Sequence, residues 1–255
     1  MNDEETVMNM QGQVAVVTGA ASGIGRATAE ALAARGAQIV VADIDREGGE
    51  KTVAALRERG QTAEFIAVDM TDPASIAAFA EAVHAKYGAV DVLVNGAGWG
   101  RTHPFWEGTP ELWNKLIALN LVGPMTLAKA LLPHMLERKS GRIVNIASDA
   151  GRVGSLGETV YAGAKGGLIA FTKSLARETA RHGINVNCVC PGPTDTPLLA
   201  AVPEGHLEAF KKAIPLRRFA QPSEVADAVA FFAGAQSNYV TGQVLSVSGG
   251  LTMVG

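Results

Sequence analysis

The sequence predicts a single α/β domain in which one doubly wound parallel sheet is covered by helices on both faces. Short apolar runs rich in Val, Ile and Ala alternate with longer stretches of helical periodicity along the 255 residues. No Pro- or Ser-rich linker divides the sequence, and no internal repeat stands out. Because consecutive parallel strands need crossover helices, this alternation fits one domain over residues 12–255, preceded by a flexible leader at residues 1–11.

The first elements follow one another as strand, helix, strand, helix. Residues 13–19 (QVAVVTG) form an uninterrupted apolar run, which is typical of a strand buried on both faces. Residues 24–36 have helical spacing and end at Gly36, a residue type that commonly terminates helices. An apolar strand at 37–43 and a helix at 47–60 with its own terminal glycine repeat this pattern.

The remaining elements continue in the same order. Asp72 followed by Pro73 predicts a helix start, since Asp is a favoured cap and Pro a favoured first-turn residue. Ser223 is the expected cap of the last helix. The other predicted strands are 63–69, 90–98, 141–148, 184–192 and 242–250, and the other predicted helices are 72–88, 110–137, 160–183 and 223–234.

Composition and charge argue against several classes of function. Hydrophobic residues make up 47% of the chain, the net charge is -3, and no long basic run is present, which argues against nucleic acid and anionic membranes as partners. The basic cluster at 211–218 (KKAIPLRR) is typical of a solvated loop face. No apolar run is expected to reach the length that spans a bilayer.

The amino terminus and the cysteines favour a cytoplasmic protein. The first twelve residues are acidic and polar, unlike a secretory signal or a transit peptide. Cys188 and Cys190 lie two apart in a predicted strand, where they would share one face as reduced core residues. The five histidines show no ligand spacing, so no metal site is expected.

A glycine-rich turn (TGAASGIG) with Gly19, Gly23 and Gly25 links the first strand to the first helix. Glycines there permit a tight turn and let backbone N–H groups approach a pyrophosphate at the helix N-terminus. Asp43 ends the next strand, where its carboxylate can accept hydrogen bonds from both ribose hydroxyls and would repel a 2′-phosphate. We therefore expect NAD rather than NADP, although Arg46 lies three residues further on.

Two further strand ends carry candidate cofactor residues. Asp69 ends the third strand, where a carboxylate can meet an adenine amine or serve as an ordinary turn residue. The NGAG run at 95–98 ends the fourth strand beside the point where the strand order of such a sheet reverses, which is where ligands bind. Small residues there let the backbone approach a cofactor.

Tyr161 and Lys165 stand four residues apart in a predicted helix, and Ser148 lies thirteen residues upstream of the tyrosine. Positions i and i+4 share one helix face, so the lysine ammonium would favour the phenolate and lower the pKa of the tyrosine from its usual value of about 10. Lowering it by about three units requires roughly 4 kcal/mol. A nearby serine hydroxyl can hold a substrate oxygen while the tyrosine moves its proton. Taken separately, such a pair is usually surface packing, and a serine after a strand is usually a turn residue.

These motifs together resemble the short-chain dehydrogenase/reductase family over residues 11–250, because the TGAASGIG turn, VNGAG, Asn120 in ALNLVG, Ser148, Tyr161, Lys165 and PGPTDT all occur in order. The resemblance implies a Rossmann fold with seven parallel strands and a catalytic tetrad of Asn120, Ser148, Tyr161 and Lys165. By the same analogy, Asn120 holds a water of a proton relay and Lys165 also binds the nicotinamide ribose. The cofactor-binding residues are then Gly19, Ser22, Gly23, Ile24, Gly25, Asp43, Asp69, Met70, Asn95, Ala97, Gly98, Tyr161, Lys165, Pro191, Gly192, Thr194 and Thr196.

Two positions depart from the family pattern. Gly96 stands where the family usually has a second Asn, and Ser248 stands where the last strand usually has Asp. The first departure leaves Asn95 in place. The second is expected to change a subunit contact rather than the chemistry.

Several stretches, among them NGAGWG, PGPTDTPLL and TGQVLSVSGGLTM, resemble 2-hydroxycyclohexanecarboxyl-CoA dehydrogenases more specifically. That resemblance implies NAD-dependent oxidation of a cyclic β-hydroxyacyl-CoA. A linear β-hydroxyacyl-CoA, reduction of a 3-oxoacyl-ACP, another secondary alcohol or ketone, and a nicotinamide-binding scaffold without turnover stay open.

Substrate selection is expected from Trp99, Arg152, Leu156 and the loop at about 194–216. Trp99 could wall an apolar ring or simply pack, and Arg152 could pair with a phosphate or carboxylate of the substrate or with a surface acid. A candidate handle for the CoA phosphates is formed by Lys211, Lys212, Arg217 and Arg218. The family also pairs its two long helices across subunits, which implies a homotetramer.

Overall fold

The computed structural model describes residues 9–200 and 204–253 and places seven parallel strands in one sheet. The strands are ordered β3-β2-β1-β4-β5-β6-β7, so the order reverses between β1 and β4. Their bounds are β1 Val14–Thr18, β2 Gln38–Asp43, β3 Ala63–Ala67, β4 Val92–Asn95, β5 Gly141–Ile146, β6 Ile184–Pro191 and β7 Val244–Val247. The predicted doubly wound α/β domain is confirmed.

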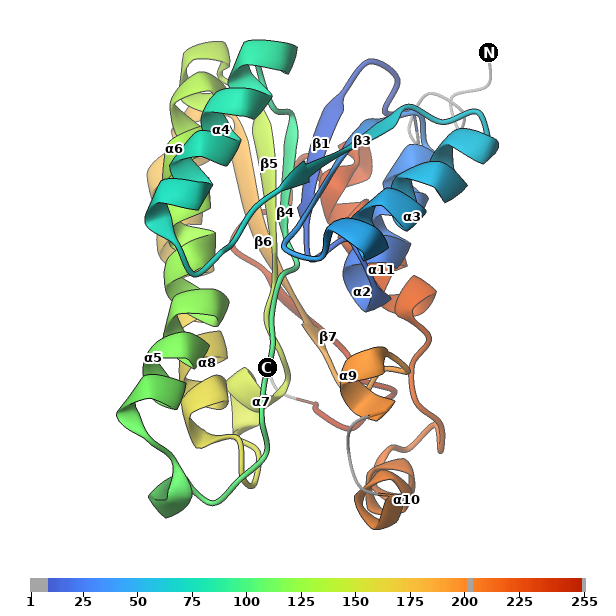
Figure 1. Ribbon diagram of the computed structural model, residues 1–255, viewed down its shortest axis with the longest axis vertical. Helices are drawn as coiled ribbons and strands as arrows, with labels where there is room; N and C mark the ends of the chain where they lie inside the picture. The colour runs from blue at the N-terminus through green and yellow to red at the C-terminus, as the bar shows by residue number, and fades with distance from the viewer. Residues whose placement is uncertain (1–8, 201–203, 254–255) are drawn as a thin grey trace.

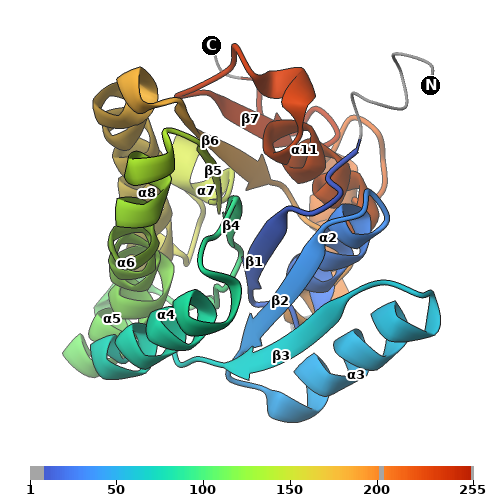
Figure 2. The ribbon, with the colours of Figure 1, turned by 90° about the horizontal axis from the view of Figure 1, so that it is seen from above.

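Two layers of helices enclose the sheet, as the view in Figure 2 shows. One layer consists of α2 (Gly23–Ala33), α3 (Arg46–Glu58) and α11 (Pro222–Ala233). The other consists of α4 (Pro73–Tyr87), α5 (Pro110–Ile117), α6 (Gly123–Arg138) and α8 (Thr159–Thr179). Short helices that the sequence pattern did not indicate lie in the loops, at α7 (Ala150–Val153), α9 (Pro197–Ala200) and α10 (Glu204–Ala213).

The strands are apolar because helices cover both of their faces. All five residues of β1 and all four residues of β4 are buried. One core cluster packs Leu32 of α2 and Phe232 of α11 against the sheet, and a second packs Phe79 of α4 and Leu127 of α6 against its other face. Burying a side chain of this size contributes about 1.5–3 kcal/mol, so the two clusters fix the sheet between its helical layers.

The strands are all parallel and run from the upper to the lower half of Figure 1. Their carboxyl ends therefore meet at one edge, in the lower half of the view, where α7 and α9 also lie. Open α/β sheets bind ligands outside this edge at the point where the strand order reverses. The loops after β1 and β4 are accordingly the first place to look for a site.

The predicted leader at residues 1–11 extends too far into the chain. Met10 is 2% exposed and belongs to the core cluster that contains Leu32. Its backbone N–H donates to Arg35 O at 2.7 Å, and its own carbonyl accepts from Gln13 N at 3.0 Å. The folded domain thus includes Met10, because its apolar side chain is removed from water. Residues 1–8 lie outside the described part of the chain.

The single helix predicted at 110–137 contains a π turn. α5 ends at Ile117, residues Ala118–Val122 form the π turn, and α6 begins at Gly123. A π turn inserts an extra residue into an α-helix and often marks a functional site. Here it presents Asn120, which is fully buried.

The helix from Pro110 to Arg138 is long and apolar enough to cross a membrane by length and composition, with a mean hydropathy of 1.5 in its most apolar window. The expectation that no stretch reaches this length is therefore wrong. Only 39% of that window is buried, because Leu127 and Leu131 pack in the core while Val122 and Met125 stay partly exposed. The core helix of a globular domain passes the same test, and one side of this helix packs against the sheet through Leu127 and Leu131.

The helix caps agree with the sequence at one end of the chain and differ at the other. Asp72 caps α4 as predicted, since its Oδ1 accepts from Ala74 N at 2.9 Å. α11 begins at Pro222, and Glu224 Oε2 accepts from the Gln221 N–H at 2.8 Å. Ser223 is therefore not its cap, because it lies inside the first turn.

The two cysteines are free and buried in β6, with 3.9 Å between the sulfur atoms of Cys188 and Cys190. The prediction of reduced core residues on one strand face is confirmed. Within residues 9–200 and 204–253, no group of three or more His, Cys, Asp or Glu residues is placed to hold a metal ion.

Candidate active site

The glycine turn after β1 lies directly against the end of β4. Gly19 has a φ of +71°, and a Cβ atom there would lie 2.8 Å from the Ala97 backbone. Thr18 Oγ1 accepts from Gly96 N at 3.0 Å and from Ala97 N at 3.1 Å, which joins the two strand ends. The turn can therefore bring bare backbone to a ligand at the start of α2.

Asp43 lies beside this turn, as predicted. Its Oδ2 accepts from Ala21 N at 3.0 Å and its Oδ1 accepts from Asp45 N at 3.0 Å. A carboxylate has about four lone-pair sites, so both oxygens can still accept a hydrogen bond from a ligand hydroxyl. The nearby Arg46 lies over the Phe65 ring, with its guanidinium carbon 5.3 Å from the centroid.

Two other predicted cofactor residues are held by their neighbours. Asp69 Oδ1 accepts from both the backbone N–H and the hydroxyl of Thr71, at 2.8 and 2.7 Å. Asn95 is 1% exposed, and its amide donates to Asn145 Oδ1 at 2.8 Å. Asn145 in turn donates to Thr172 of α8 at 2.8 Å, so the Asn95 side chain ties β4 to β5 and α8. The Asn95 side chain is enclosed between the strands, so the backbone is the part of this residue that can approach a cofactor, and its role in cofactor binding stays a prediction.

The loop after β6 returns to the glycine turn. A Cβ atom on Gly23 would lie 3.2 Å from Thr196 Cγ2, and the Thr194 hydroxyl donates to Gly192 O at 2.9 Å. Three loops that are far apart in the sequence, after β1, β4 and β6, thus meet at the carboxyl edge of the sheet. The remaining predicted cofactor residues lie at the same edge, in the loops after β1, β3 and β4, in the first turn of α2 and at the end of β6: Ser22, Met70, Gly98, Ile24, Gly25 and Pro191.

The π turn brings Asn120 to this edge. Its amide nitrogen donates to Trp99 O at 2.8 Å and to Leu116 O at 2.9 Å. Its Oδ1 is buried and has no hydrogen-bond partner within the described residues. A buried acceptor without a partner is costly, so this oxygen is suited to a donor that arrives with a ligand or a water.

Lys165 lies next to Asn120 Oδ1, on α8. The lysine is 2% exposed, and its Nζ donates to Ile146 O at 2.9 Å. A Cβ atom on Gly98 would lie 2.9 Å from Asn120 Oδ1 and 3.1 Å from Lys165 Nζ. The amine therefore faces the end of β4 and the backbone of Gly98, and not the far side of α8.

Tyr161 and Ser148 complete the group. The Ser148 hydroxyl lies close enough to the Tyr161 phenol to lower its pKa by acting as a hydrogen-bond donor. Ser148 Oγ also accepts from Ala150 N at 3.2 Å, which leaves the serine proton free to point to another acceptor. Lys165 Nζ lies 5.8 Å from the centroid of the Tyr161 ring. The structure thus brings all four predicted tetrad residues together.

The pKa of Tyr161 is raised, which is opposite to the prediction. Burial of the phenol is the largest cause, the negative charge of Glu158 raises the pKa further, and the hydrogen bond from Ser148 opposes both. Burial also lowers the pKa of Lys165 to about 8. Removing a phenolate from water is costly, and in this site that cost outweighs the favourable effect of a nearby ammonium.

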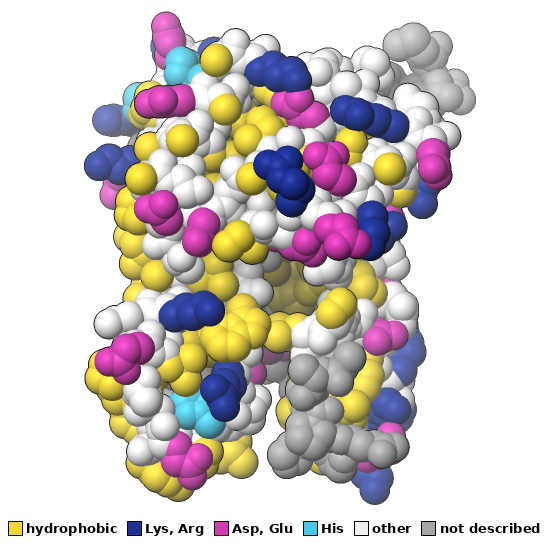
Figure 3. All heavy atoms as spheres, in the orientation of Figure 1, with side chains coloured by type: hydrophobic (Ala, Val, Ile, Leu, Met, Phe, Trp, Pro, Cys, Tyr) yellow, Lys and Arg dark blue, Asp and Glu magenta, His cyan; other side chains and the backbone are white. Residues whose placement is uncertain are grey.

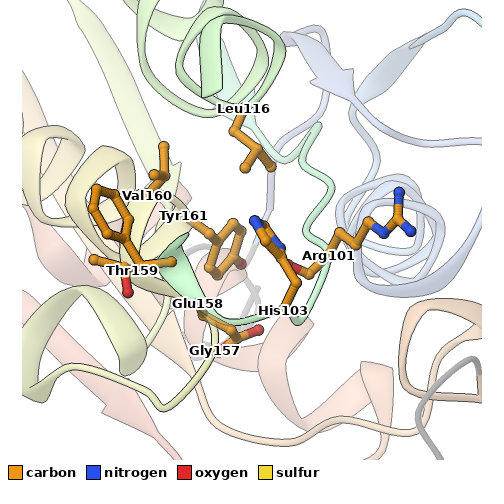
Figure 4. Close-up of a pocket in the computed structure, with 9 residues that line it drawn as sticks. Arg101, His103, Leu116, Gly157, Glu158, Thr159, Val160 and Tyr161 are labelled. Carbon is orange, nitrogen blue, oxygen red and sulfur yellow. The ribbon is translucent and has the colours of Figure 1, made fainter. Parts of the chain in front are cut away.

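A narrow, shallow crevice with no enclosed space for a water molecule lies beside Tyr161, between the loop after β4 and the start of α8. Figure 4 shows His103 next to the Tyr161 ring, with Leu116 and Glu158 on either side. The full lining consists of Arg101, His103, Phe105, Leu116, Gly157, Glu158, Thr159, Val160 and Tyr161. These neighbours of Tyr161 were not predicted from the sequence. For Glu158 a signal existed, since it precedes the tyrosine by three residues and i,i+3 positions share a helix face.

None of the three predicted substrate residues lines this crevice. Trp99 packs under Lys115, whose Nζ lies 5.3 Å from the centroid of a Trp99 ring. Arg152 donates to Ser246 of β7 at 2.7 Å and so points toward the last strand. Leu156 is 99% exposed, because its loop carries it out into solvent. On the wider face, Figure 3 shows a hollow near the middle with hydrophobic atoms at its floor.

The basic cluster in the predicted substrate loop is occupied by local contacts. Arg218 forms two hydrogen bonds of 2.6 Å with the Glu224 carboxylate, Lys211 pairs with Glu208 at 3.1 Å, and Arg217 donates to Lys212 O. Residues 201–203 of this loop lie outside the described part.

These groups fit a nicotinamide dinucleotide. The glycine turn offers backbone N–H groups to a pyrophosphate, Asp43 offers carboxylate oxygens to a ribose, and Asn120 Oδ1 and Lys165 Nζ flank the bare backbone of Gly98. A side chain at Gly19 or Gly98 would fill that path, since its Cβ would lie within about 3 Å of neighbouring atoms.

Comparisons with known proteins agree with this site. Residues 19–252 match the family model described as enoyl-(acyl carrier protein) reductase. The chain is 41% identical over 247 residues to the 3-oxoacyl-[acyl-carrier-protein] reductase FabG of Escherichia coli, covering 97% of this chain and 100% of that protein. It is 42% identical over 243 residues to the cis-4-hydroxycyclohexanecarboxylate dehydrogenase of Sinomonas cyclohexanicum, covering 95% and 97%. A solved structure described as a putative gluconate dehydrogenase from Agrobacterium tumefaciens matches with a TM-score of 0.94 at 31% identity, covering 97% and 99%.

The contribution of Glu158 to the ionisation of Tyr161 can be tested directly. Removing its negative charge in Glu158→Gln should lower the pKa of Tyr161, because a like charge disfavours the phenolate. The phenolate absorbance of Tyr161, isolated by subtracting the spectrum of Tyr161→Phe, should then begin to rise at a lower pH than in the wild-type protein. Glu178→Gln, an exposed change further along α8, is the matched control and should leave the onset unchanged. An onset at the same or a higher pH in Glu158→Gln would contradict the assignment.

Proposed function

Since this chain belongs to the short-chain dehydrogenase/reductase family and is an oxidoreductase of CH–OH and ketone groups, we propose that it interconverts a β-hydroxyacyl thioester, cyclic or linear, and the corresponding ketone with NAD. The observation that carries the proposal is the convergence of Tyr161, Ser148, Lys165 and Asn120 beside a bare backbone path to the glycine turn.

The four residues divide the proton chemistry between them. Burial and the charge of Glu158 keep the Tyr161 phenol protonated, which suits it to donate a proton to a ketone oxygen in the reductive direction and to recover it in the oxidative one. The Ser148 hydroxyl donates to the same substrate oxygen, while its own oxygen accepts from Ala150 N. A bound nicotinamide would accept or supply the hydride at the carbinol carbon.

Lys165 and Asn120 support this proton transfer without contacting the substrate oxygen. With a pKa of about 8, the Lys165 amine is mostly an ammonium at neutral pH. One of its protons is used by Ile146 O, and the others are directed to the space beside Gly98, where a ribose hydroxyl would be held. Asn120 Oδ1 can accept a hydrogen bond from a water there and so link Lys165 to solvent.

The preference for NAD over NADP rests on the end of β2. The Asp43 carboxylate lies beside the glycine turn, where a 2′-phosphate would bring a second negative charge. Arg46, the nearest candidate to offset that charge, is 3.8 Å from Glu50 and lies over Phe65. The Asp43 carboxylate can accept hydrogen bonds from both hydroxyls of the NAD ribose, whereas the 2′-phosphate of NADP would need a cation at this position.

Two relatives favour different substrates of the same chemical kind. The name of the Escherichia coli relative specifies a 3-oxoacyl group on acyl carrier protein, and the name of the Sinomonas relative specifies a hydroxycyclohexane carboxylate. Both of these substrates carry an oxygen on a carbon chain or ring, together with an acyl or carboxyl group. A cyclic hydroxyacyl-CoA has the ring of the substrate named for the Sinomonas relative and a thioester like the substrate named for the Escherichia coli relative. Reduction of a 3-oxoacyl-ACP is the second candidate. The local pairing of Arg218 and Lys211 argues against these cations as a CoA phosphate handle.

Turnover should depend on Tyr161. Tyr161→Phe removes the proton donor and keeps the ring, so turnover should fall at least about 100-fold while NADH still binds, as measured by quenching of protein fluorescence. Tyr239→Phe changes a fully exposed tyrosine and should keep wild-type turnover. Undiminished turnover in Tyr161→Phe would end the proposed mechanism.

Substrate and cofactor can be identified in one spectrophotometric screen. The probes are 2-hydroxycyclohexanecarboxyl-CoA, 3-hydroxybutyryl-CoA, free cis-4-hydroxycyclohexanecarboxylate and, for the reverse direction, acetoacetyl-CoA and acetoacetyl-ACP, each with NAD(H) and NADP(H) in parallel. We expect the cyclic thioester to give the highest kcat/KM and NAD to be favoured at least about tenfold, which corresponds to about 1.4 kcal/mol. A higher kcat/KM for acetoacetyl-ACP would select the second candidate. NADH binding without turnover of any probe would indicate a scaffold.

We also propose that four copies assemble through the long helices. Ile117, Val122 and Met125 form an exposed apolar strip along α5, the π turn and α6, with exposed fractions of 38%, 45% and 40%. An exposed strip of this kind beside buried core positions is typical of a subunit contact. Light scattering should give a mass four times the 26.4 kDa of one chain, and Met125→Lys should lower that mass. A wild-type mass equal to one chain would overturn the assembly.

A further inference from the structure

A buried carboxylate follows Ser148 directly and has no part in the proposed mechanism. Asp149 is 4% exposed, and its backbone N–H donates to Pro191 O at 3.1 Å. One of its carboxylate oxygens accepts from the Ser246 hydroxyl, and the other is buried without a hydrogen-bond partner within the described residues. Since a buried charge is costly unless neighbouring groups compensate it, its contacts call for an explanation.

The compensating group comes from the other end of the same short helix. Arg152 Nη1 donates to Ser246 Oγ at 2.7 Å, and the same hydroxyl donates to Asp149. One side chain of β7 thus bridges an acid that precedes α7 and a base in its last turn. We call this group of Asp149, Arg152 and Ser246 the α7 clamp. A helix as short as α7, with four residues, has little stability of its own, so tertiary contacts fix its position.

The position of α7 in turn determines the position of Ser148. The first turn of α7 holds this serine twice, because Ala150 N donates to Ser148 Oγ at 3.2 Å and Gly151 N donates to Ser148 O at 3.0 Å. α7 also lies on the backbone of α8 at the lysine, since a Cβ on Gly151 would lie 2.7 Å from the carbonyl carbon of Lys165. A small shift of α7 would therefore move the Ser148 hydroxyl relative to Tyr161.

We propose that the α7 clamp is a positioning device that fixes the Ser148 hydroxyl against the Tyr161 phenol, so that the last strand of the sheet controls the geometry of proton transfer. Asp149, Arg152 and Ser246 act through Ser148 and do not touch the substrate. This inference rests on the proposed function of Ser148. It also gives Arg152 a role that differs from the substrate contact that the sequence suggested.

The test uses Ser246→Ala, which removes the bridging hydroxyl, and Ser246→Thr, which restores one. With 3-hydroxybutyryl-CoA and NAD, Ser246→Ala should lower kcat roughly tenfold, because misplacement of a reacting group by less than 1 Å is costly. KM and the Kd of NADH should stay within about twofold, and Ser246→Thr should recover most of the loss. Ser237→Ala, which removes a different buried hydroxyl bonded to Phe232 O and Gly234 O, should lower thermal stability without lowering kcat.

A double-mutant cycle shows whether the effect passes through Ser148. In a Ser148→Ala background, Ser246→Ala should change kcat by less than about twofold, because the group that it positions is absent. The same tenfold loss in both backgrounds would overturn the proposal, and so would an equal loss of kcat in Ser237→Ala. If Ser148→Ala itself kept full turnover, the proposed function of Ser148 would fail. If Ser148→Ala were slow while Ser246→Ala matched the wild type, only the clamp would fail.

The pH profile gives an independent readout that does not need residual activity in Ser148→Ala. The hydrogen bond from Ser148 opposes the rise in the pKa of Tyr161, so a misplaced serine should move the pH–rate profile for alcohol oxidation to higher pH in Ser246→Ala. Ser246→Thr should return the profile to its wild-type position, and Ser237→Ala should not move it. An unshifted profile in Ser246→Ala would count against the clamp.

Discussion

The buried amine of Lys165 is the constraint on which the rest of the site depends. Lys165 is 2% exposed, and a buried amine needs hydrogen-bond acceptors close to it. One acceptor is the carbonyl oxygen of Ile146, the last residue of β5. On the other side of the amine, Gly98 has no side chain and Asn120 Oδ1 has no hydrogen-bond partner within the described residues, which leaves room for a ligand. Four separate elements, β4, β5, the π turn and α8, must therefore meet at one point, and the parallel strand order brings their ends together.

Burial has opposite effects on the two titrating groups at this point. It raises the pKa of the Tyr161 phenol and lowers the pKa of the Lys165 amine, so both groups are pushed toward their neutral forms. A neutral phenol beside a serine hydroxyl can donate a proton, and the groups around it set the pH at which it ionises. Glu158 and Ser148 act on it in opposite directions, which makes the tyrosine responsive to small changes in its surroundings.

The strands and the long helices could be predicted from the sequence because local patterns of residues determine them. The uninterrupted apolar run of β1, the glycine after α2 and the Asp72 cap of α4 are decided by neighbours in the chain. The sequence could also predict that Tyr161, Lys165 and Asn120 belong together, since their motifs occur in order. The lining of the crevice beside Tyr161 was not predictable in this way. His103 and Glu158 reach Tyr161 only because two loops pair, with His103 N donating to Gly157 O at 2.9 Å.

Other differences have the same origin in tertiary contacts. The motif placed Asn95 at the cofactor edge of the sheet, but it did not indicate that the side chain donates to Asn145 on the adjacent strand. Arg152 looked like a handle for an anion until Ser246, nearly a hundred residues away, took up its guanidinium. The direction of the Tyr161 pKa shift was missed because burial cannot be read from an i,i+4 spacing. Each of these features depends on which strand lies next to which, and sequence spacing alone does not carry that information.

The π turn at Ala118–Val122 makes the chemistry sensitive to the length of one helix as well as to its side chains. A regular α-helix advances about 100° per residue, so a chain that was one residue shorter here could close the widened turn and rotate Asn120 away from Trp99 O. Substitutions at the exposed positions of α5 and α6 leave the widened turn in place. A single deletion within it would instead move the Asn120 amide away from the backbone oxygens of Trp99 and Leu116.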